Sequence, residues 1–306
     1  MSTGFLSTYF ILESSAPSFD ATRSFGVAAH DAGGANQLAA MLRRTKWNPA
    51  YAAISGPAAD IMTGLCSNVS AFPQQHQICK LDYLITSTGW SSDLEHIARQ
   101  MARGSGVYSI ALLDHWGNYE GRFDRKGEKS LPDEIWVVDA YAESIARELF
   151  SNVPVFLRQD FYCDEVCSLI QPVSASTQNN FLYLLEPIRS RWSGTEEGEF
   201  QALRFFLNSI PKLSLPIGTT VLLRPHPSES PDKYRRFLGD FGDVNVRLSS
   251  GDLPESISCA RWVGGCYTYA LTIALRAGRE VFCTIPPYAA DCDLPFSGIK
   301  YLRDLV

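Results

Sequence analysis

The chain has 306 residues, of which 45% are hydrophobic and 20% charged, so it has the composition of a globular protein and the length for two domains. Its formal net charge of −6 and its pI of about 5.4 argue against general nucleic-acid binding, which needs a basic surface. The eight cysteines include no Cys-x-x-Cys pair, which argues against a zinc site and favours a reduced, cytoplasmic setting.

Strands and helices alternate through the first half of the chain. Apolar runs predict strands over 25–29, 51–57, 83–88, 107–113, 134–138 and 153–157. Helical periodicity predicts helices over 37–44, around 94–101 and over 142–149. The loop 30–36 contains two glycines and joins the first strand to the first helix, which is the opening of a Rossmann-type domain.

The stretch 167–180 has the composition of a linker, and the alternation restarts after it. Strands are predicted over 181–185, 219–223, 244–248 and 262–264, with a last strand over 280–285. Helices are predicted over 198–210, 231–238, 253–259 and 268–277. This pattern predicts an α/β fold with two Rossmann-like, doubly wound domains, residues 1–170 and 171–306, that face a central cleft.

Two motifs of the second domain carry a resemblance to a known family. RPHPSE at 224–229 follows a predicted strand, and VGGCYT at 263–268 joins a later strand to a helix. This order resembles the donor half of GT-B fold glycosyltransferases. It is most similar to the bacterial sialyltransferase-like and capsule-polymer transferases, whose donor domain carries a His-Pro motif and a later Ser/Thr-rich helix start. The acidic motif of sialyltransferases is absent in its usual form, and HDAGG at 30–34 occupies a comparable place.

His226 and Arg224 lie where the strand 219–223 ends, and strand ends of an open α/β sheet are placed to meet a ligand. Prolines on both sides of His226 restrict its backbone, and its imidazole can donate a hydrogen bond to a leaving phosphate. Arg224 can make a bidentate contact with phosphate or carboxylate. Pro227 and Ser228 complete this donor motif. The alternative interpretation is a turn histidine beside a surface arginine.

The turn from Gly264 to Thr268 is a second candidate for donor binding. Gly264 and Gly265 would let the backbone approach a phosphate, and the following helix N-terminus offers N–H groups and a positive dipole. Thr268 either contributes its hydroxyl or simply caps the helix. Glu186, after the strand 181–185, is placed to hydrogen-bond the base or ribose of a nucleotide.

Asp31 or His30 is predicted to be the catalytic base. Both follow the first strand, in the domain that the resemblance assigns to the acceptor, and inverting transfer requires a group that takes the proton of the acceptor hydroxyl. The competing interpretation is that Asp31 caps the following helix while the glycines shape the turn. The segment lacks the G-x-G-x-x-G pattern, so no NAD is assigned.

Residues 113–119 place polar and aromatic side chains at the end of the strand 107–113. Trp116 or Tyr119 can stack on a sugar face, while Asp114 and Asn118 can hydrogen-bond sugar hydroxyls. The alternative is a satisfied Asp–His pair among core aromatics. The expected acceptor site consists of Asp114, His115, Trp116, Asn118 and Tyr119.

The resemblance implies an inverting, metal-independent glycosyltransferase that uses a nucleotide-activated sugar, with a CMP-activated acidic sugar as the first expectation. The acceptor would be a glycan or glycolipid in polysaccharide biosynthesis, and neither a cofactor nor a nucleic acid would be needed. Three alternatives stay open within the fold: a nucleotide-sugar 2-epimerase, a polyol-phosphate transferase and a non-catalytic nucleotide-sugar-binding subunit.

The expected location is the cytoplasm. No uncharged apolar run reaches the ~18 residues of a membrane span. The N-terminal stretch MSTGFLSTYFILESS lacks the basic region and the cleavage site of a signal peptide. Peripheral association with the inner face of the membrane, or with a partner subunit, would bring the protein to its acceptor.

Overall fold

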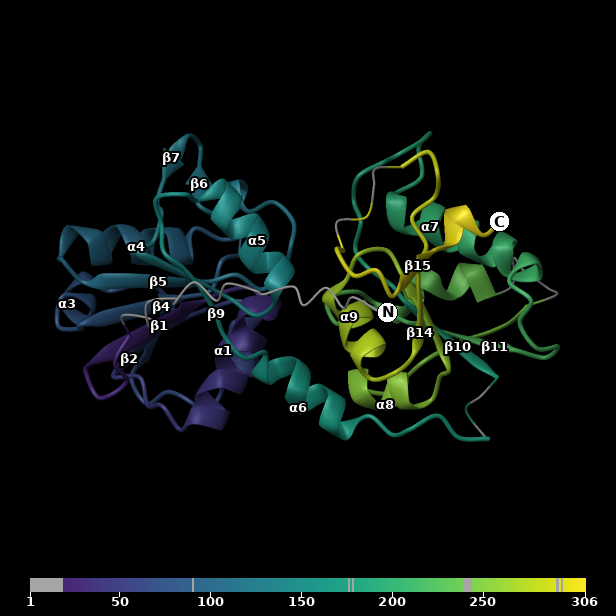
Figure 1. Cartoon of the computed structure of the whole chain (residues 1–306), viewed down its shortest axis with the longest axis horizontal. Helices are drawn as coiled ribbons and strands as arrows, with labels where there is room; N and C mark the ends of the chain where they lie inside the picture. Colours follow the sequence, from purple (N-terminus) through teal and green to yellow (C-terminus); the bar gives the residue numbers. More distant parts are fainter. Residues whose placement is uncertain are drawn as a thin grey trace, which may run out of the picture. The chain divides into compact units, whose positions relative to one another are not determined.

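The computed structural model describes residues 19–89, 91–175, 177, 179–238, 244–289, 292 and 294–306. The chain divides into two compact units, Met1–Asp160 (unit 1) and Phe161–Val306 (unit 2). Each unit contains a parallel sheet with helices packed on it (Figure 1). The N-terminal stretch on which the signal-peptide expectation rests lies outside the described residues.

The described part of unit 1 is built on seven parallel strands in the order β3-β2-β1-β4-β5-β8-β9. These strands are β1 (Phe25–Ala29), β2 (Tyr51–Ile54), β3 (Val69–Ser70), β4 (Tyr83–Thr86), β5 (Tyr108–Leu112), β8 (Glu134–Val137) and β9 (Val155–Leu157). The central strands are buried along their length because both faces of the sheet are covered, which explains the continuous apolar runs in the sequence.

The helices of unit 1 connect these strands. They are α1 (Ala32–Thr45), α2 (Ala58–Ile61), α3 (Gln75–Ile78), α4 (Leu94–Gly104), α5 (Ala140–Leu149) and the 3-10 helix η1 (Glu120–Arg122), and a hairpin is formed by β6 (Asp124–Arg125) and β7 (Glu128–Lys129). The strand order reverses between β1 and β4, so right-handed crossovers place α1 and α4 on opposite faces of the sheet, as Figure 1 shows. Doubly wound sheets bind their ligands at the carboxyl ends of the strands at such a reversal.

Unit 2 repeats this architecture. Its described residues form six parallel strands in the order β12-β11-β10-β13-β14-β15, with the reversal between β10 and β13. The strands are β10 (Asn180–Leu184), β11 (Thr220–Arg224), β12 (Asn245–Leu248), β13 (Trp262–Gly265), β14 (Glu280–Cys283) and β15 (Ile299–Tyr301). The helices are α6 (Phe161–Leu169), α7 (Gly198–Ser209), α8 (Leu253–Ser258) and α9 (Tyr269–Arg276), with the 3-10 helices η2 (Ile210–Lys212), η3 (Pro231–Leu238) and η4 (Leu302–Asp304).

Packing in the core of unit 2 fixes the orientation of the Arg224 side chain at the end of β11. Val221 and Leu223 belong to the buried cluster that also contains Phe181 of β10 and Phe206 of α7. Because successive side chains of a strand point to opposite faces, Arg224 lies on the face away from this cluster. The guanidinium of Arg224 therefore lies on the face of the sheet opposite to the aromatic core of unit 2.

The prediction of two Rossmann-like, doubly wound α/β domains is confirmed, and the two sheets share the order of their first six strands. The loop predicted over 30–36 is wrong, because α1 begins at Ala32 and includes Gly33 and Gly34 in its first turn. The reason is close packing. A Cβ at Gly33 would lie 2.1 Å from Asp114 Oδ2, and a Cβ at Gly34 would lie 2.4 Å from Ser87 Cβ, so only glycine fits.

The segment expected to be a linker begins inside a helix. Helix α6 packs against α8 and α9, and its Asp164 pairs with Arg276 of α9. These contacts place α6 in unit 2, so the boundary between the units falls after Asp160 and not after residue 170. The strand predicted to be last, 280–285, is followed by β15, which pairs with β14 and is too short to give a pattern in the sequence.

Candidate functional site

Predicted site residues lie at the carboxyl ends of the central strands in both units. In unit 1, His30 and Asp31 follow β1, which pairs with β4 at the reversal of strand order. In unit 2, Glu186 follows β10, and the predicted turn from Gly264 to Thr268 begins at the end of β13, at the equivalent point. Each group therefore occupies the position at which a doubly wound sheet binds its ligand.

His30 and Asp31 form a hydrogen-bonded pair in unit 1. The distance between His30 Nδ1 and Asp31 Oδ1 is 2.7 Å, and the Ser91 hydroxyl donates to the same carboxylate oxygen. Asp31 occupies the N-cap position of α1, but its side chain makes no capping hydrogen bond. Helix capping therefore does not account for this carboxylate. The side chains of His30 and Asp31 are 21% and 28% exposed, so a ligand can reach both.

The hydrogen bonds around Asp31 keep its carboxylate ionised. Burial alone would raise the pKa of Asp31, but the hydrogen bonds from Ser91 and His30 outweigh it and lower the pKa below its ordinary value. In a neutral imidazole, an Nδ1–H that donates to a carboxylate leaves Nε2 as the acceptor nitrogen. The pair thus has the arrangement of a base and the carboxylate that orients it.

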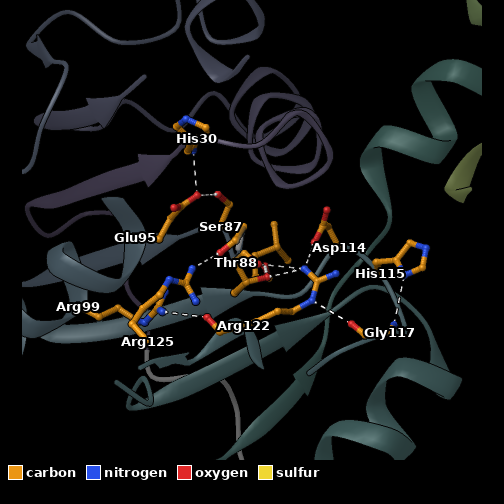
Figure 2. Close-up of polar contacts among 12 residues, drawn as sticks. His30, Ser87, Thr88, Glu95, Arg99, Asp114, His115, Gly117, Arg122 and Arg125 are labelled. Atoms are coloured by element: carbon orange, nitrogen blue, oxygen red, sulfur yellow. Dashed lines mark hydrogen bonds and ion pairs between the residues drawn. The ribbon is translucent and has the colours of Figure 1, made fainter. Parts of the chain in front are cut away.

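A buried glutamate holds the backbone of His30 in place, and a glycine leaves room for its ring. Glu95, in the first turn of α4, is 0% exposed, and its Oε1 accepts hydrogen bonds from the His30 backbone N–H at 2.9 Å and the Ser87 hydroxyl at 2.7 Å (Figure 2). A Cβ at Gly56 would lie 2.4 Å from His30 Nε2. Sequence reasoning missed Glu95, because an acidic residue in the first turn of a helix is already explained by the helix dipole.

Asp114 belongs to a second charged network, beside the first turn of α1. Its Oδ1 is 2.6 Å from Arg122 Nη1, and its Oδ2 lies against Gly33. Arg122 is 3% exposed and also donates at 3.1 Å to the carbonyl and hydroxyl oxygens of Thr88 and to the carbonyl oxygen of Gly117 (Figure 2). The guanidinium joins the segments that follow β4 and β5, and it fixes the position of Asp114.

The aromatic members of the predicted acceptor site lie in the core of unit 1. Trp116 is 5% exposed and Tyr119 is 2% exposed, and Trp116 Nε1 donates a hydrogen bond to Asp139 at 2.9 Å. Rings buried to this extent present no face on which a sugar can stack. The structure therefore contradicts the expected stacking role of both residues.

His115 and Asn118 lie on the same turn and are more accessible. His115 is half-buried, and its Nδ1 accepts a hydrogen bond from the Gly117 backbone N–H at 3.2 Å. Asn118 is exposed and has a φ of 53°, in the left-handed region that asparagine tolerates. Asp114 forms its ion pair with Arg122. The arginine therefore balances the charge of this carboxylate, and the expected Asp–His pair is not formed.

Arg224 ends β11 in unit 2, and its side chain makes no hydrogen bond to the residues that the structure describes. The residue is half-buried, its Nε is buried without a partner, and no hydrogen bond to its guanidinium is found among the residues that the structure describes. Burial lowers the pKa of Arg224, against the opposing effect of Asp252, but a guanidinium still carries its charge at neutral pH. An anionic ligand would supply the missing acceptor.

Ser228 fixes the tautomer of His226. The Ser228 backbone N–H donates to His226 Nδ1 at 3.2 Å, and the Ser228 hydroxyl lies 2.8 Å from the same nitrogen, with the exposed Pro227 between the two residues. An Nδ1 that accepts leaves the proton of the neutral imidazole on Nε2. Burial lowers the pKa of His226 and outweighs the raising effect of Glu229, so the imidazole is neutral at pH 7 and can donate through Nε2.

The turn expected to bind a phosphate already holds a carboxylate of the chain. Glu186 Oε1 accepts hydrogen bonds from the backbone N–H groups of Cys266 at 2.7 Å and Tyr267 at 3.2 Å, and Oε2 accepts from Tyr267 at 3.2 Å. Thr268 caps α9, since its hydroxyl oxygen accepts from the Ala270 backbone N–H at 3.3 Å. The structure thus brings Glu186 and this turn together, with the carboxylate facing inward.

Gly264 and Gly265 serve packing inside unit 2. A Cβ at Gly264 would lie 2.8 Å from the Phe181 ring, and a Cβ at Gly265 would lie 3.2 Å from Glu186 Oε1. Both residues are buried in β13. The space that these glycines leave is filled by the chain itself, so the expectation that they open the backbone to a phosphate is not supported.

Within the described residues, no group of three or more His, Cys, Asp or Glu side chains is arranged to hold a metal ion. The chain contains one Asp-x-Asp sequence, Asp291-Cys292-Asp293, and its two aspartates lie outside the described residues. Independence of divalent metal stays a prediction from the resemblance.

Comparison with solved structures shows the fold. The chain resembles HepE of Anabaena, solved in complex with UDP-glucose, with a TM-score of 0.55 and 8% identity over 86% of this chain and 80% of HepE. MurG of Acinetobacter baumannii gives a TM-score of 0.53 and 10% identity over 92% of this chain and 89% of MurG. A Listeria monocytogenes protein assigned as a UDP-N-acetylglucosamine 2-epimerase gives a TM-score of 0.54 and 9% identity over 85% of this chain and 79% of that protein.

At these identities the likeness establishes the two-domain GT-B fold, and the finer resemblance to sialyltransferase-like enzymes stays a prediction. No protein-family model and no curated protein sequence matches the chain. Among the helices in the described part of the chain, none is long and apolar enough to cross a membrane.

Proposed function

We propose that the protein is a glycosyltransferase that takes its sugar from a nucleotide-activated donor bound to unit 2. The observation that carries this proposal is the pair Arg224 and His226. Among the described residues the Arg224 guanidinium has no hydrogen-bond acceptor, and His226 is a neutral imidazole with its proton on Nε2. A departing phosphate gains negative charge, and a cation and a hydrogen-bond donor stabilise that charge. HepE, which shares the fold, was solved with UDP-glucose, and this supports a nucleotide-sugar donor.

In this proposal unit 1 binds the acceptor and removes its proton. His30 Nε2 takes the proton of the acceptor hydroxyl, and Asp31 holds the Nδ1 proton and stabilises the imidazolium that forms. The hydroxyl oxygen attacks the anomeric carbon while the bond to the donor phosphate breaks, and the phosphate leaves with the electron pair. Asp31 acting alone is the alternative, but its lowered pKa makes it a weak proton acceptor.

The donors to test first are UDP sugars and CMP-activated acidic sugars. The UDP series follows from HepE, and the CMP series follows from the RPHPSE motif. Thermal unfolding of the full chain should be followed with UDP, CMP, GDP, CDP and the corresponding sugars. A ligand at a hundred times its Kd stabilises the folded state by about 2.7 kcal/mol, which raises Tm by several degrees. If none of these compounds shifts Tm or gives heat in calorimetry, the proposal falls.

A 2-epimerase is the second candidate, because the Listeria protein matches the fold as well as the glycosyltransferases do. The two activities differ in their products. An epimerase converts UDP-N-acetylglucosamine to its 2-epimer without an acceptor, whereas a transferase consumes the donor and glycosylates an acceptor. Proton NMR of incubations with and without a glycan acceptor separates them. Transfer should continue in EDTA; a requirement for added magnesium or manganese would direct attention to Asp291 and Asp293.

A further inference from the structure

Arg125 of the β6–β7 hairpin holds the segment that follows β4. Its Nε donates to Asp93 Oδ1 at 3.0 Å, and its Nη2 donates to the carbonyl oxygens of Gly89 at 2.7 Å and Ser92 at 3.0 Å. Its Nη1 donates to two carbonyl oxygens of η1 and β6. The guanidinium thus has as many acceptors as it has N–H groups. Three of these acceptors belong to the segment 89–93, so the arginine ties this segment to the hairpin.

The same segment lies against the carboxylate of Asp31. The Ser91 hydroxyl donates to Asp31 Oδ1, and the Ser91 backbone N–H also donates to this carboxylate. Gly89 is buried, and a Cβ at this position would lie 2.3 Å from Asp31 Oδ2. Ser91 is exposed and lies in the sequence between Gly89 and Ser92, so its position depends on how these two residues are held.

We infer that Arg125 is a positioning residue for Asp31, because it holds the segment that carries Ser91 on the carboxylate. The hydrogen bonds from Ser91 fix the direction in which Asp31 presents Oδ1 to His30 Nδ1. Misplacing a catalytic group by about 1 Å can cost on the order of 10²-fold in rate. This inference rests on the proposed role of the His30–Asp31 pair in proton removal.

The ionisation of Asp31 supports the geometry. Burial raises the pKa of Asp31, but the hydrogen bonds from Ser91 and His30 outweigh burial and lower the pKa below its ordinary value. Loss of the hydrogen bonds from Ser91 should therefore raise the pKa of Asp31. This change can be measured on the full chain without any substrate.

The first test is the titration of the Asp31 carboxylate by carbon-13 NMR, with His30 followed in the same samples because the two share a hydrogen bond. Arg125→Ala should raise the pKa of Asp31. Loss of a nearby positive charge has the same sign, so a double-mutant cycle with Ser91→Ala is needed. If Arg125 acts through Ser91, its removal should raise the pKa of Asp31 much less in the Ser91→Ala background, whereas a pure charge effect would be equal in both backgrounds.

The second test is the rate of transfer, once a donor and an acceptor are known. Arg125→Ala should lower kcat roughly 10–100-fold, because the carboxylate that orients His30 is no longer held in place. KM for the donor should be unchanged, since the proposed donor residues lie in unit 2. Arg125→Lys keeps the charge but lacks the planar fork, so it should show the same changes at smaller size. It carries both tests if Arg125→Ala fails to fold.

Arg103→Ala is the matched control. Arg103 lies in the last turn of α4, at the opposite end of this helix from the segment 89–93, and donates to the carbonyl oxygen of Leu131 at 2.7 Å. Its replacement removes one positive charge from unit 1 and no contact to that segment. The pKa of Asp31 and kcat should both stay at their wild-type values.

A pKa of Asp31 that is unchanged in Arg125→Ala, or that rises equally with and without Ser91→Ala, would overturn the inference. The outcomes also separate the inference from the proposed function. A pKa that rises through Ser91 in a protein that transfers no sugar keeps the positioning role and removes the function. Transfer at the wild-type rate by folded Arg125→Ala, with the pKa of Asp31 unchanged, does the reverse.

Discussion

Two arginines at the carboxyl edges of the two sheets have opposite surroundings. Arg122 of unit 1 is almost fully buried and donates to Asp114, Thr88 and Gly117. Arg224 of unit 2 is half-buried, and the described residues offer its guanidinium no hydrogen-bond acceptor. A guanidinium whose donors are used inside the fold shapes a site, whereas one with donors to spare can bind a ligand. A structural arginine and a ligand-binding arginine are therefore told apart by how many of their N–H groups have an acceptor within the protein, and not by burial alone.

The carboxylates of the two edges differ in the same way. Asp31 in unit 1 is partly exposed and is held by the side chains of His30 and Ser91. Glu186 in unit 2 faces inward and is held by the backbone. Unit 1 thus has a partly exposed His–Asp pair and an arginine whose donors are used within the fold. Among the described residues, unit 2 has an arginine without a hydrogen-bond acceptor and an inward-facing carboxylate. This contrast underlies the proposed roles, which are proton removal in unit 1 and phosphate binding in unit 2.

The largest expected effect concerns the base. Asp31→Asn should lower kcat/KM for transfer by about 10²–10⁴-fold, because an amide cannot stabilise the imidazolium that forms on His30. Nucleotide affinity should be unchanged, since the proposed donor residues lie in unit 2. Initial rates and calorimetry on the same preparation measure both quantities. A variant that transfers sugar at the wild-type rate would remove Asp31 and its pairing with His30 from the mechanism.

Asp139→Asn is the control for this substitution. Asp139 caps α5 through the N–H groups of Tyr141 and Ala142, and asparagine caps about as well as aspartate. Its transfer rate should stay close to wild type. His30→Gln then assigns the base: loss of activity to the level of Asp31→Asn identifies His30, and normal activity identifies Asp31.

A smaller effect, on stability, is expected for the arginine with satisfied donors. Arg122→Ala should lower the free energy of unfolding by about 3–5 kcal/mol, because Asp114 is left partly buried without its cation. Urea denaturation followed by circular dichroism measures this. Arg147→Ala removes an exposed ion pair with Glu143 on α5 and should cost only about 0–1 kcal/mol. If the two variants lose the same free energy of unfolding, the network around Arg122 contributes no more to stability than an exposed ion pair.

The smallest expected effect is on binding, for the arginine with unused donors. Arg224→Leu should weaken nucleotide affinity by roughly 10–100-fold, the value of a hydrogen bond to a charged group, and should leave stability unchanged or slightly higher. Arg261→Leu, at the start of β13, is the matched control and should bind nucleotide normally. Should Arg224→Leu lose stability and keep its affinity, the contrast between the two arginines would be reversed.

Much of the fold could be predicted because buried parallel strands leave apolar runs in the sequence. The same runs locate the strand ends, and so His30, Asp31, Arg224 and His226 could be singled out before the structure. The prediction failed where packing overrides local preference. Two glycines in succession predict a loop, yet the first turn of α1 needs them because it packs against Ser87 and the carboxylate of Asp114.

Contacts between distant residues explain the other failures. Glu186 and Cys266 are 80 residues apart, and no local pattern shows that the carboxylate of one occupies the N–H groups after the other. Glu95 and His30 are 65 residues apart, and their hydrogen bond is equally invisible in the sequence. The rings of Trp116 and Tyr119 suit a sugar site or a core, and only their burial decides between the two.

The close packing of α1 also constrains how the chain can diverge. Any side chain at Gly33 meets Asp114, and any side chain at Gly34 meets Ser87, so homologues that keep this packing must keep both glycines. His30 and Asp31 precede them at a fixed spacing, since β1 ends at Ala29 and α1 begins at Ala32. A pattern of His-Asp-x-Gly-Gly after an apolar strand can therefore identify homologues in which little else of the sequence has been retained.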